Sequence, residues 1–306
     1  MARKSSSVHG VVVVDKPAGP TSHDVVDVLR RALKERRVGH TGTLDPFATG
    51  VLALCVGRAT RLARFLTAGE KVYEASVRLG FETDTDDLTG NRVGETSPVL
   101  LERARLEDAL ANMLGEQEQV APVYSAKRRN GKRLYDLARA GVPVDPPAQT
   151  ITISSLRLVA LQGDRVDLEV TCSAGTYIRA LARDLGRALG VGGHLAALRR
   201  TRNGPFRLNQ AAKLEEVRAG GARLIPLSDV PLDLPALRVT SEGVAAALHG
   251  RDVAGEGAID AACSQVRLLD PDGGLVAIAS RRATTAGPEL WHPEVVVVDA
   301  VKMSSN

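Results

Sequence analysis

Apolar residues recur at two different periods along the chain and divide it into expected strands and helices. Short apolar runs and alternation predict strands over residues 10–17, 51–56, 71–79, 151–161, 165–172 and 194–201. Helical spacing predicts helices after Thr21 or Ser22 and over residues 58–66, 105–114, 177–189 and 214–219. Because hairpin-forming strands are mixed with irregularly placed helices, the pattern indicates an α+β fold rather than a doubly wound sheet.

A segment punctuated by prolines predicts a boundary between two domains, at residues 1–232 and 236–306. The balance of charge changes sign there. Residues 236–306 hold 6 Lys/Arg and 9 Asp/Glu, a net of −3, whereas residues 1–235 carry a net of +7. For the smaller domain, the pattern predicts a helix over 241–248 and strands near 265–269, 275–279 and 294–298.

Composition excludes several classes of protein. No apolar run approaches the roughly 20 residues of a membrane span, and the basic, polar start is not a signal peptide, so we expect a cytoplasmic protein. Cys55, Cys172 and Cys263 are scattered, which favours buried free thiols. The histidines lack metal-ligand spacing, and acidic residues 83–90 lack the glutamate that ends an EF-hand loop. We therefore expect a turn at 83–90 and no bound metal.

Basic residues gather in two clusters. Residues 127–139 carry six bases against one acid, and residues 179–207 carry seven arginines against Asp184 alone. The first cluster is expected to form a loop that runs into a helix from about Arg133. A solvated charged face would explain either cluster alone, but the two together favour a polyanionic partner, and nucleic acid in particular.

A glycine-rich loop at residues 39–50 is the strongest candidate for a site. Three glycines permit backbone angles that are closed to other residues, and Pro46 biases Asp45 towards an extended conformation. A solvent-exposed turn would use the same residue types. However, the apolar run 51–56 follows at once, which places the loop at the edge of the core. A P-loop is excluded because no Lys-Ser or Lys-Thr follows.

Four motifs in this sequence resemble the TruB family, the bacterial tRNA pseudouridine-55 synthases. They are G-V-V-V-V-D-K-P at 10–17, G-H-T-G-T-L-D-P-F-A-T-G at 39–50, Y-S-A with G-K-R-L-Y at 124–135, and G-T-Y-I-R-A-L-A-R-D-L-G at 175–186. The motifs occur in the order of the family and cover about residues 10–205. The Asp45 motif and the G-T-Y-I-R motif together are highly specific.

The resemblance implies an α+β catalytic domain with a largely antiparallel mixed sheet, followed by a small PUA-like β domain that binds RNA. It implies an isomerase that converts uridine 55 in the TΨC arm of tRNA to pseudouridine. The C1′–N1 bond is cut, the uracil rotates, and C5 is joined to C1′. No cofactor is needed for this isomerisation, and we expect a monomer whose partner is tRNA.

The resemblance also assigns roles to residues. Asp45 is the catalytic aspartate, Arg179 the cation that keeps it ionised, and Tyr73 the tyrosine that stacks on the uracil. His40 matches the histidine that fills the space left by the flipped base, and Tyr177 is expected to line the pocket. Residue types alone also allow interpretations without a catalytic role: a solvated helix charge for Arg179, a core tyrosine for Tyr73 and a turn histidine for His40.

Further substrate-binding residues are expected on three segments. They are Lys16, Gly42, Thr43, Lys127, Arg128, Lys132 and Arg133. The family usually places an aliphatic residue and then a lysine after Y-S-A, whereas this chain has Lys127 and Arg128, so the aliphatic contact is lost. Because the C-terminal domain is acidic, we expect few phosphate contacts from it.

Two other functions fit part of the sequence. A tRNA-binding folding helper without chemistry would satisfy the basic clusters, but it would not need a constrained carboxylate that faces a polyanion. A guide-RNA-dependent pseudouridine synthase of the archaeal and eukaryotic type would share the Asp45 motif. Activity on a bare tRNA transcript would exclude this second alternative.

Overall fold

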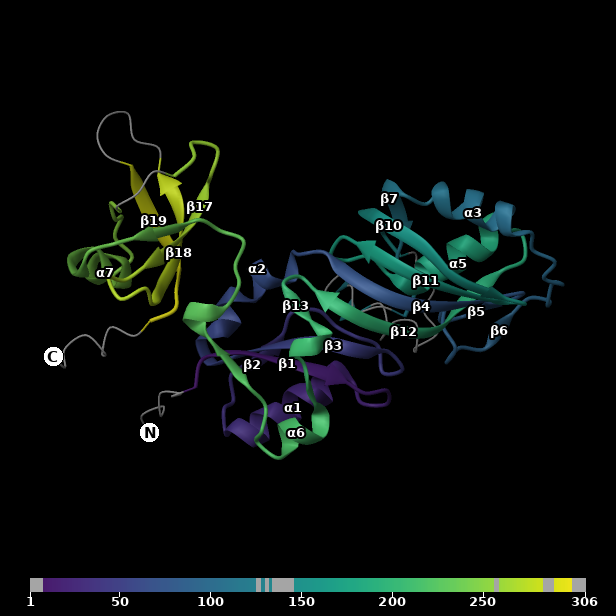
Figure 1. The fold of residues 1–306 in the computed structure, drawn as a ribbon, viewed down its shortest axis with the longest axis horizontal. Helices are drawn as coiled ribbons and strands as arrows, with labels where there is room; N and C mark the ends of the chain where they lie inside the picture. Colours follow the sequence, from purple (N-terminus) through teal and green to yellow (C-terminus); the bar gives the residue numbers. More distant parts are fainter. Residues whose placement is uncertain are drawn as a thin grey trace.

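The computed structural model describes residues 8–124, 128–129, 132–133, 146–255, 259–282 and 289–298 (Figure 1). Only the backbone is described at 128–129 and 132–133, where two short strands form a hairpin. Lys127 and the helix expected beyond Arg133 lie outside the described residues.

A large mixed sheet forms the body of the protein. Its strand order is β14-β1-β3-β12-β4-β11-β10-β7, with β2, β13 and β15 attached beside this path. Neighbours are antiparallel except for β1 with β14 and β3 with β12, so the predicted α+β class is confirmed. The strands are β1 (Gly10–Lys16), β2 (Val38–His40), β3 (Thr49–Val56), β4 (Lys71–Leu79), β7 (Gly115–Val120), β10 (Ala148–Gln162), β11 (Arg165–Cys172), β12 (Gly193–Asn203), β13 (Phe206–Arg207), β14 (Ala212–Lys213) and β15 (Leu224–Pro226).

Helices cover the sheet where its strands are apolar. They are α1 (Ser22–Leu33), α2 (Ala63–Thr67), α3 (Arg103–Ala111), α5 (Ile178–Ala188) and α6 (Leu214–Arg218), whereas α7 (Ser241–Leu248) packs on the C-terminal strands described below. Figure 1 shows α1 and α6 beside β1, and α3 and α5 beside the strands at the other end of the sheet. No helix within the described residues is long and apolar enough to cross a membrane.

Several boundaries differ from the sequence-based prediction. The helix expected over 58–66 is divided into a 3₁₀ helix, Gly57–Leu62, and α2. The helix expected over 105–114 begins and ends earlier, and β7 follows it. The pattern missed β7 because it is a polar edge strand, GEQEQV, with one buried residue. The hairpin β5 (Glu82–Thr83) and β6 (Arg92–Val93) was also missed.

The sheet has two parts that meet at a short junction. Between β3 and β12 only two residue pairs are in register, Thr49 with Arg199 and Gly50 with Arg200. Gly50 has φ +103°, and a Cβ at this position would lie 2.2 Å from the carbonyl oxygen of Arg200. Only glycine therefore allows the two backbones to approach this closely.

A second, four-stranded sheet forms the C-terminal part of the chain. Its order is β16 (Ala236–Arg238), β17 (Gln265–Leu269), β18 (Leu275–Arg282) and β19 (Leu290–Val296). The last strand begins earlier than the predicted 294–298. The sheet and α7 enclose their own apolar core around Trp291, as expected for a small β domain. The proposed boundary between residues 232 and 236 remains a prediction.

The C-terminal sheet also packs on the body. Leu275 and Ile278 share an apolar cluster with Leu62 and with the face of β1 and β3 that points away from α1. Arg58 donates to the carbonyl of Val297 at 3.2 Å, and Arg64 pairs with Glu294 at 3.0 Å. The two sheets are therefore joined by buried contacts.

We expect Gly50→Ala to destabilise the protein by roughly 2–5 kcal/mol, because it combines a strained φ with a backbone clash. Gly163→Ala is the matched control. Gly163 also has positive φ, but a Cβ there would meet nothing within 4 Å, so about 1–2 kcal/mol should be lost. Denaturant unfolding of both variants measures the difference. Equal losses would contradict the assigned close approach.

Candidate functional site

The loop between β2 and β3 carries Asp45 and is fixed by side chains from other elements. Ser22, at the start of α1, donates to the carbonyl of Leu44 at 2.9 Å and accepts from its amide at 2.8 Å. Asn203 of β12 donates to the hydroxyl of Thr41 at 3.0 Å. The amide of Ala48 closes a turn on the carbonyl of Asp45 at 3.1 Å. The backbone around Asp45 is thus held in one position.

Asp45 forms an ion pair with Arg179, as the sequence predicted they should lie together. The Nε atom of Arg179 lies 3.0 Å from Oδ2, and Nη2 lies 3.5 Å from Oδ1. Arg179 sits in the first turn of α5 and its side chain is 7% exposed, whereas that of Asp45 is 34% exposed. The carboxylate therefore has a buried partner on one side and an accessible surface on the other.

The pKa of the Asp45 carboxyl reflects opposing influences. Burial raises this pKa above its usual range, and the negative charge of Asp87 adds to the increase. The positive charges of Arg179 and Lys16 act in the opposite direction and favour the ionised form. Arg179 thus supplies the charge that a partly buried carboxylate needs if it is to act as a base or nucleophile.

Asp87 is a site residue that the sequence did not single out. Its Oδ2 atom lies 3.4 Å from Nη1 of Arg179, so the guanidinium bridges two carboxylates. Its Oδ1 atom accepts from the hydroxyls of Thr85 and Thr89 at 2.8 and 2.6 Å. The acidic segment 83–90 is a turn, as predicted, and it also orients Arg179. An acid-rich turn without a metal pattern, in a chain with an arginine-rich helix, is the signal that could have revealed it.

Arg179 is further fixed by two backbone carbonyls. It donates to the carbonyl of Thr85 at 3.0 Å and to that of Tyr124 at 2.9 Å. Tyr124 lies three residues before the basic stretch that begins at Lys127, so the cation of the site binds the backbone close to the start of that stretch. Its contacts identify Arg179 as a buried structural and electrostatic partner of Asp45, not a solvated helix charge.

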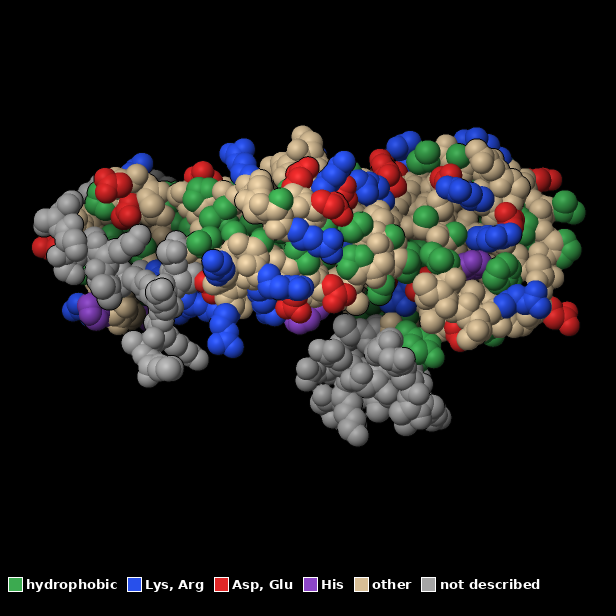
Figure 2. All heavy atoms as spheres, turned by 90° about the horizontal axis from the view of Figure 1, so that it is seen from below, with side chains coloured by type: hydrophobic (Ala, Val, Ile, Leu, Met, Phe, Trp, Pro, Cys, Tyr) green, Lys and Arg blue, Asp and Glu red, His purple; other side chains and the backbone are tan. Residues whose placement is uncertain are grey.

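Most other arginines of residues 179–207 are also paired with acidic side chains, so the local count of charge overstates the free positive charge of this cluster. On α5, Arg183 binds Asp86 at 2.9 Å and Arg187 binds Glu82 at 2.7 Å. On β12, two further ion pairs join Arg199 to Asp15 and Arg202 to Glu70. Figure 2 accordingly shows acidic side chains beside basic ones on the face seen from below. The counter-charges come from distant segments, which a local count of charge does not detect.

Tyr73 lies on β4 and is 6% exposed, within the alternating apolar face that the sequence predicted. Burial raises the pKa of its hydroxyl, and the charge of Asp45 acts in the same direction. The two predicted site residues are therefore electrostatic neighbours. Tyr73 keeps its proton at neutral pH and presents an uncharged ring.

Lys16, a predicted substrate-binding residue, lies buried beside the Asp45 turn. Its side chain is fully buried and donates to the carbonyls of Pro17, Pro46 and Ala48 at 3.0, 3.1 and 2.7 Å. Burial lowers its pKa to about 8, although the charge of Asp45 opposes this change. Lys16 thus stabilises the Asp45 turn through the carbonyls of Pro46 and Ala48, and its contact with substrate stays a prediction.

The remaining predicted residues surround the loop. His40 is half-buried and its Nδ1 accepts from the amide of Gly42 at 3.3 Å, as a turn histidine would. Burial lowers the pKa of His40, which favours the neutral ring. Thr43 is exposed. Tyr177 precedes α5, and its backbone is held by Gln119 through bonds of 2.8 and 3.1 Å.

The predicted RNA-binding roles of Lys127, Arg128, Lys132 and Arg133 remain predictions. Lys127 lies outside the described residues, and the side chains of the other three are not among those described. Within the described part of the chain, no group of three or more His, Cys, Asp or Glu side chains could hold a metal ion. The three cysteines are free thiols; Cys55 and Cys172 are buried and Cys263 is half-buried.

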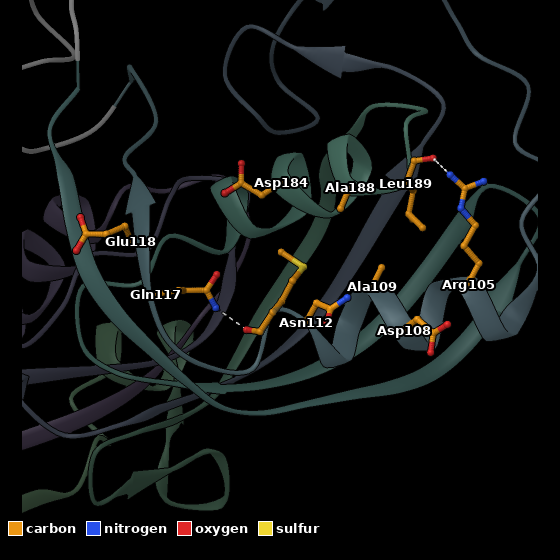
Figure 3. Close-up of a pocket in the computed structure, with 10 residues that line it drawn as sticks. Arg105, Asp108, Ala109, Asn112, Gln117, Glu118, Asp184, Ala188 and Leu189 are labelled. Carbon is orange, nitrogen blue, oxygen red and sulfur yellow. Dashed lines mark hydrogen bonds between the residues drawn. The ribbon is translucent and has the colours of Figure 1, made fainter.

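The groove in Figure 3 lies away from the Asp45 site. It has a volume of about 530 Å³ and lies between α3, β7 and the C-terminal half of α5. Helix α5 contributes Asp184 and Ala188 to the groove and Arg179 to the Asp45 site, so the two places lie at different positions on the same helix.

Comparison with known families gives two matches. The family described as TruB family pseudouridylate synthase (N terminal domain) matches residues 30–178. The tRNA pseudouridylate synthase B C-terminal domain matches residues 179–223, which end before the second sheet begins.

Individual proteins match most of the chain. A tRNA pseudouridine synthase B of Symbiobacterium thermophilum is 48% identical over 80% of this chain and 83% of its own. One of Solibacter usitatus is 42% identical over 94% and 99%. Among solved structures, a chain of an H/ACA RNP bound to a substrate RNA containing 2′-deoxyuridine aligns with a TM-score of 0.70. It is 25% identical, over 95% of this chain and 85% of its own.

The two neighbours of Asp45 should move its pKa in opposite directions. Arg179→Gln removes a positive charge that favours the carboxylate, so the pKa of Asp45 should rise. Asp87→Asn removes a negative charge, so the pKa should fall. A ¹³C NMR titration of the Asp45 carboxyl measures both. Asp164→Asn, an exposed carboxylate paired with Arg78, is the control that should leave it unchanged. Shifts of the same sign in the first two variants would contradict the assigned geometry.

Proposed function

This chain belongs to the TruB family and is a tRNA pseudouridine synthase, and we propose that its Asp45 site isomerises uridine 55 of the TΨC loop. The observation that carries the proposal is the Asp45–Arg179 pair, in which a fixed carboxylate is open on one side and bound to a buried cation on the other. A pure RNA-binding surface gains nothing from such a carboxylate, because it repels phosphate.

The proposed chemistry uses the ionised form of Asp45. The carboxylate acts as a nucleophile at the uracil or the sugar, or as a base at C2′. Each role requires that the side chain is charged and positioned, and the contacts of Arg179 and the turn at Ala48 favour both. Cleavage of the C1′–N1 bond and formation of the C5–C1′ bond leave the composition unchanged, so no cofactor takes part.

Reaching the target base requires that it leaves its stack. Extrusion of a base costs a few kcal/mol of unstacking. In our proposal, the ring of Tyr73 stacks on the flipped uracil, and His40 fills the space that it leaves. The neutral form of both rings supports this assignment, because uncharged aromatic rings stack on bases with little desolvation cost.

Three further properties are expected of this enzyme. We expect the enzyme to work as a monomer in the cytoplasm. We also expect the C-terminal β domain to contact tRNA through few phosphates, because residues 236–306 are acidic overall. The basic stretch 127–139 is the main proposed phosphate-binding segment, and it begins three residues after Tyr124, whose carbonyl binds Arg179.

We expect Asp45→Asn to lower pseudouridine formation by about 10³-fold or more, the scale for loss of a catalytic carboxylate. Binding of tRNA should persist, because the amide keeps the size of the side chain. The assay incubates the enzyme with a tRNA transcript labelled at uridine and maps the modified nucleotide. Glu107→Gln, an exposed carboxylate on α3 paired with Arg103, is the control with unchanged activity. Retained turnover in Asp45→Asn would refute the role of Asp45.

The same assay separates the alternatives. A folding helper would bind tRNA without forming pseudouridine in the wild type. A guide-dependent enzyme would be inactive on a bare transcript. The higher identity to tRNA pseudouridine synthases B, 48% against 25% for the H/ACA chain, supports the guide-independent proposal.

A further inference from the structure

Arg200 of β12 is a buried charge beside the Asp45 loop that the proposed chemistry does not use. Its side chain is 1% exposed, and no carboxylate of the described residues forms an ion pair with it. Its donors go to backbone carbonyls instead. Nε binds the carbonyl of Val51 at 2.8 Å, Nη2 that of Gly42 at 3.0 Å, and Nη1 that of Thr43 at 3.4 Å. Arg200 therefore binds the backbone on both sides of Asp45, at Gly42 and Thr43 before it and at Val51 after it.

On its other side, Arg200 lies next to Tyr73. The two residues are directly opposite in the antiparallel pairing of β12 with β4, so their side chains leave the same face of the sheet. The positive charge of Arg200 counteracts the effect of burial on the pKa of the Tyr73 hydroxyl, as expected for side chains that are cross-strand neighbours. Arg200 is thus the cross-strand neighbour of the tyrosine in one part of the sheet and binds the aspartate loop of the other.

Stability alone does not account for this residue. A buried cation without a counter-ion costs free energy, and an apolar side chain of similar volume is commonly as stable or more so. Arginine can instead hold several acceptors in a fixed arrangement, because its planar guanidinium presents several N–H donors at fixed angles. At this position, the fork spans the two-pair junction where Gly50 allows the backbone of β3 to approach that of β12.

We propose that Arg200 is a positioning residue for the reaction: it fixes the Asp45 loop relative to Tyr73 across the junction of the two parts of the sheet. It acts through these two residues and does not contact the RNA, since its side chain is buried beneath the loop. The inference rests on the proposed function, because its readout is the rate at which pseudouridine forms.

The variant Arg200→Lys separates the effect of the positive charge from the effect of the arrangement of N–H donors. Lys16 and Lys71 show that the same region accommodates buried lysines bound only to carbonyls; Lys71 donates to Thr67 and Gly69 at 3.0 and 2.9 Å. Arg200→Lys therefore keeps the positive charge in a setting that accepts it. However, a single ammonium cannot reproduce the spread of donors that binds Val51, Gly42 and Thr43 together.

The test measures single-turnover pseudouridine formation on a tRNA transcript, tRNA affinity and thermal unfolding. For Arg200→Lys we expect the single-turnover rate to fall about 10²-fold, the scale for misplacement of a catalytic group by about 1 Å. The dissociation constant for tRNA should change less than about 3-fold. Arg200→Gln, which also loses the charge, should be at least as slow. Arg78→Lys is the matched control on the adjacent strand, exposed and paired with Asp164, and should behave as the wild type.

Three results would overturn the inference. They are a wild-type rate in Arg200→Lys, a loss of rate matched by an equal loss of tRNA affinity, and an Arg200→Lys chain that does not fold, which would assign Arg200 to the global fold. Failure of the proposed function is distinguishable, because the wild type itself would then form no pseudouridine at position 55.

Discussion

The guanidinium of Arg179 lies between two carboxylates that come from separate loops, and the site depends on this bridge. Asp45 follows β2 in one part of the sheet, whereas Asp87 lies in a turn that is docked on β12 in the other. With only one of the two carboxylates, the guanidinium of Arg179 would be less restricted, because its aliphatic side chain has several rotatable bonds. Held on both sides and by the carbonyls of Thr85 and Tyr124, the cation keeps one face towards Asp45 and leaves the opposite face of the carboxylate open.

Charge in this protein is balanced over long sequence separations. The arginines of α5 and β12 find their acids in segments around residues 15, 70 and 82–87. Three other buried cations, Lys16, Lys71 and Arg200, are instead bound by carbonyl groups. The protein therefore separates cations that hold the fold from the basic stretch at 127–139, which is left for the RNA in our proposal.

Local features of the site were predictable from the sequence, and long-range ones were not. The glycines and Pro46 of residues 39–50 predict a stiff loop at the edge of the core, and the alternation in 71–79 places Tyr73 on the buried face. The family motifs bring Asp45 and Arg179 together. By contrast, the burial of Lys16 and the contact of Asp87 with Arg179 depend on how distant elements pack. No periodicity within one segment carries that information, which also explains why the polar edge strand β7 was missed.

The joint between the two sheets limits how the protein can meet its substrate. Arg58 and Arg61 bind main-chain carbonyls at the end of the C-terminal sheet, and Leu275 and Ile278 belong to a cluster shared with the body. Swinging the small domain would break these bonds and expose apolar surface to water. The separation between its outer surface and Asp45 is thus a fixed span. In our proposal, an RNA that touches both must therefore adapt to that span by its own bending.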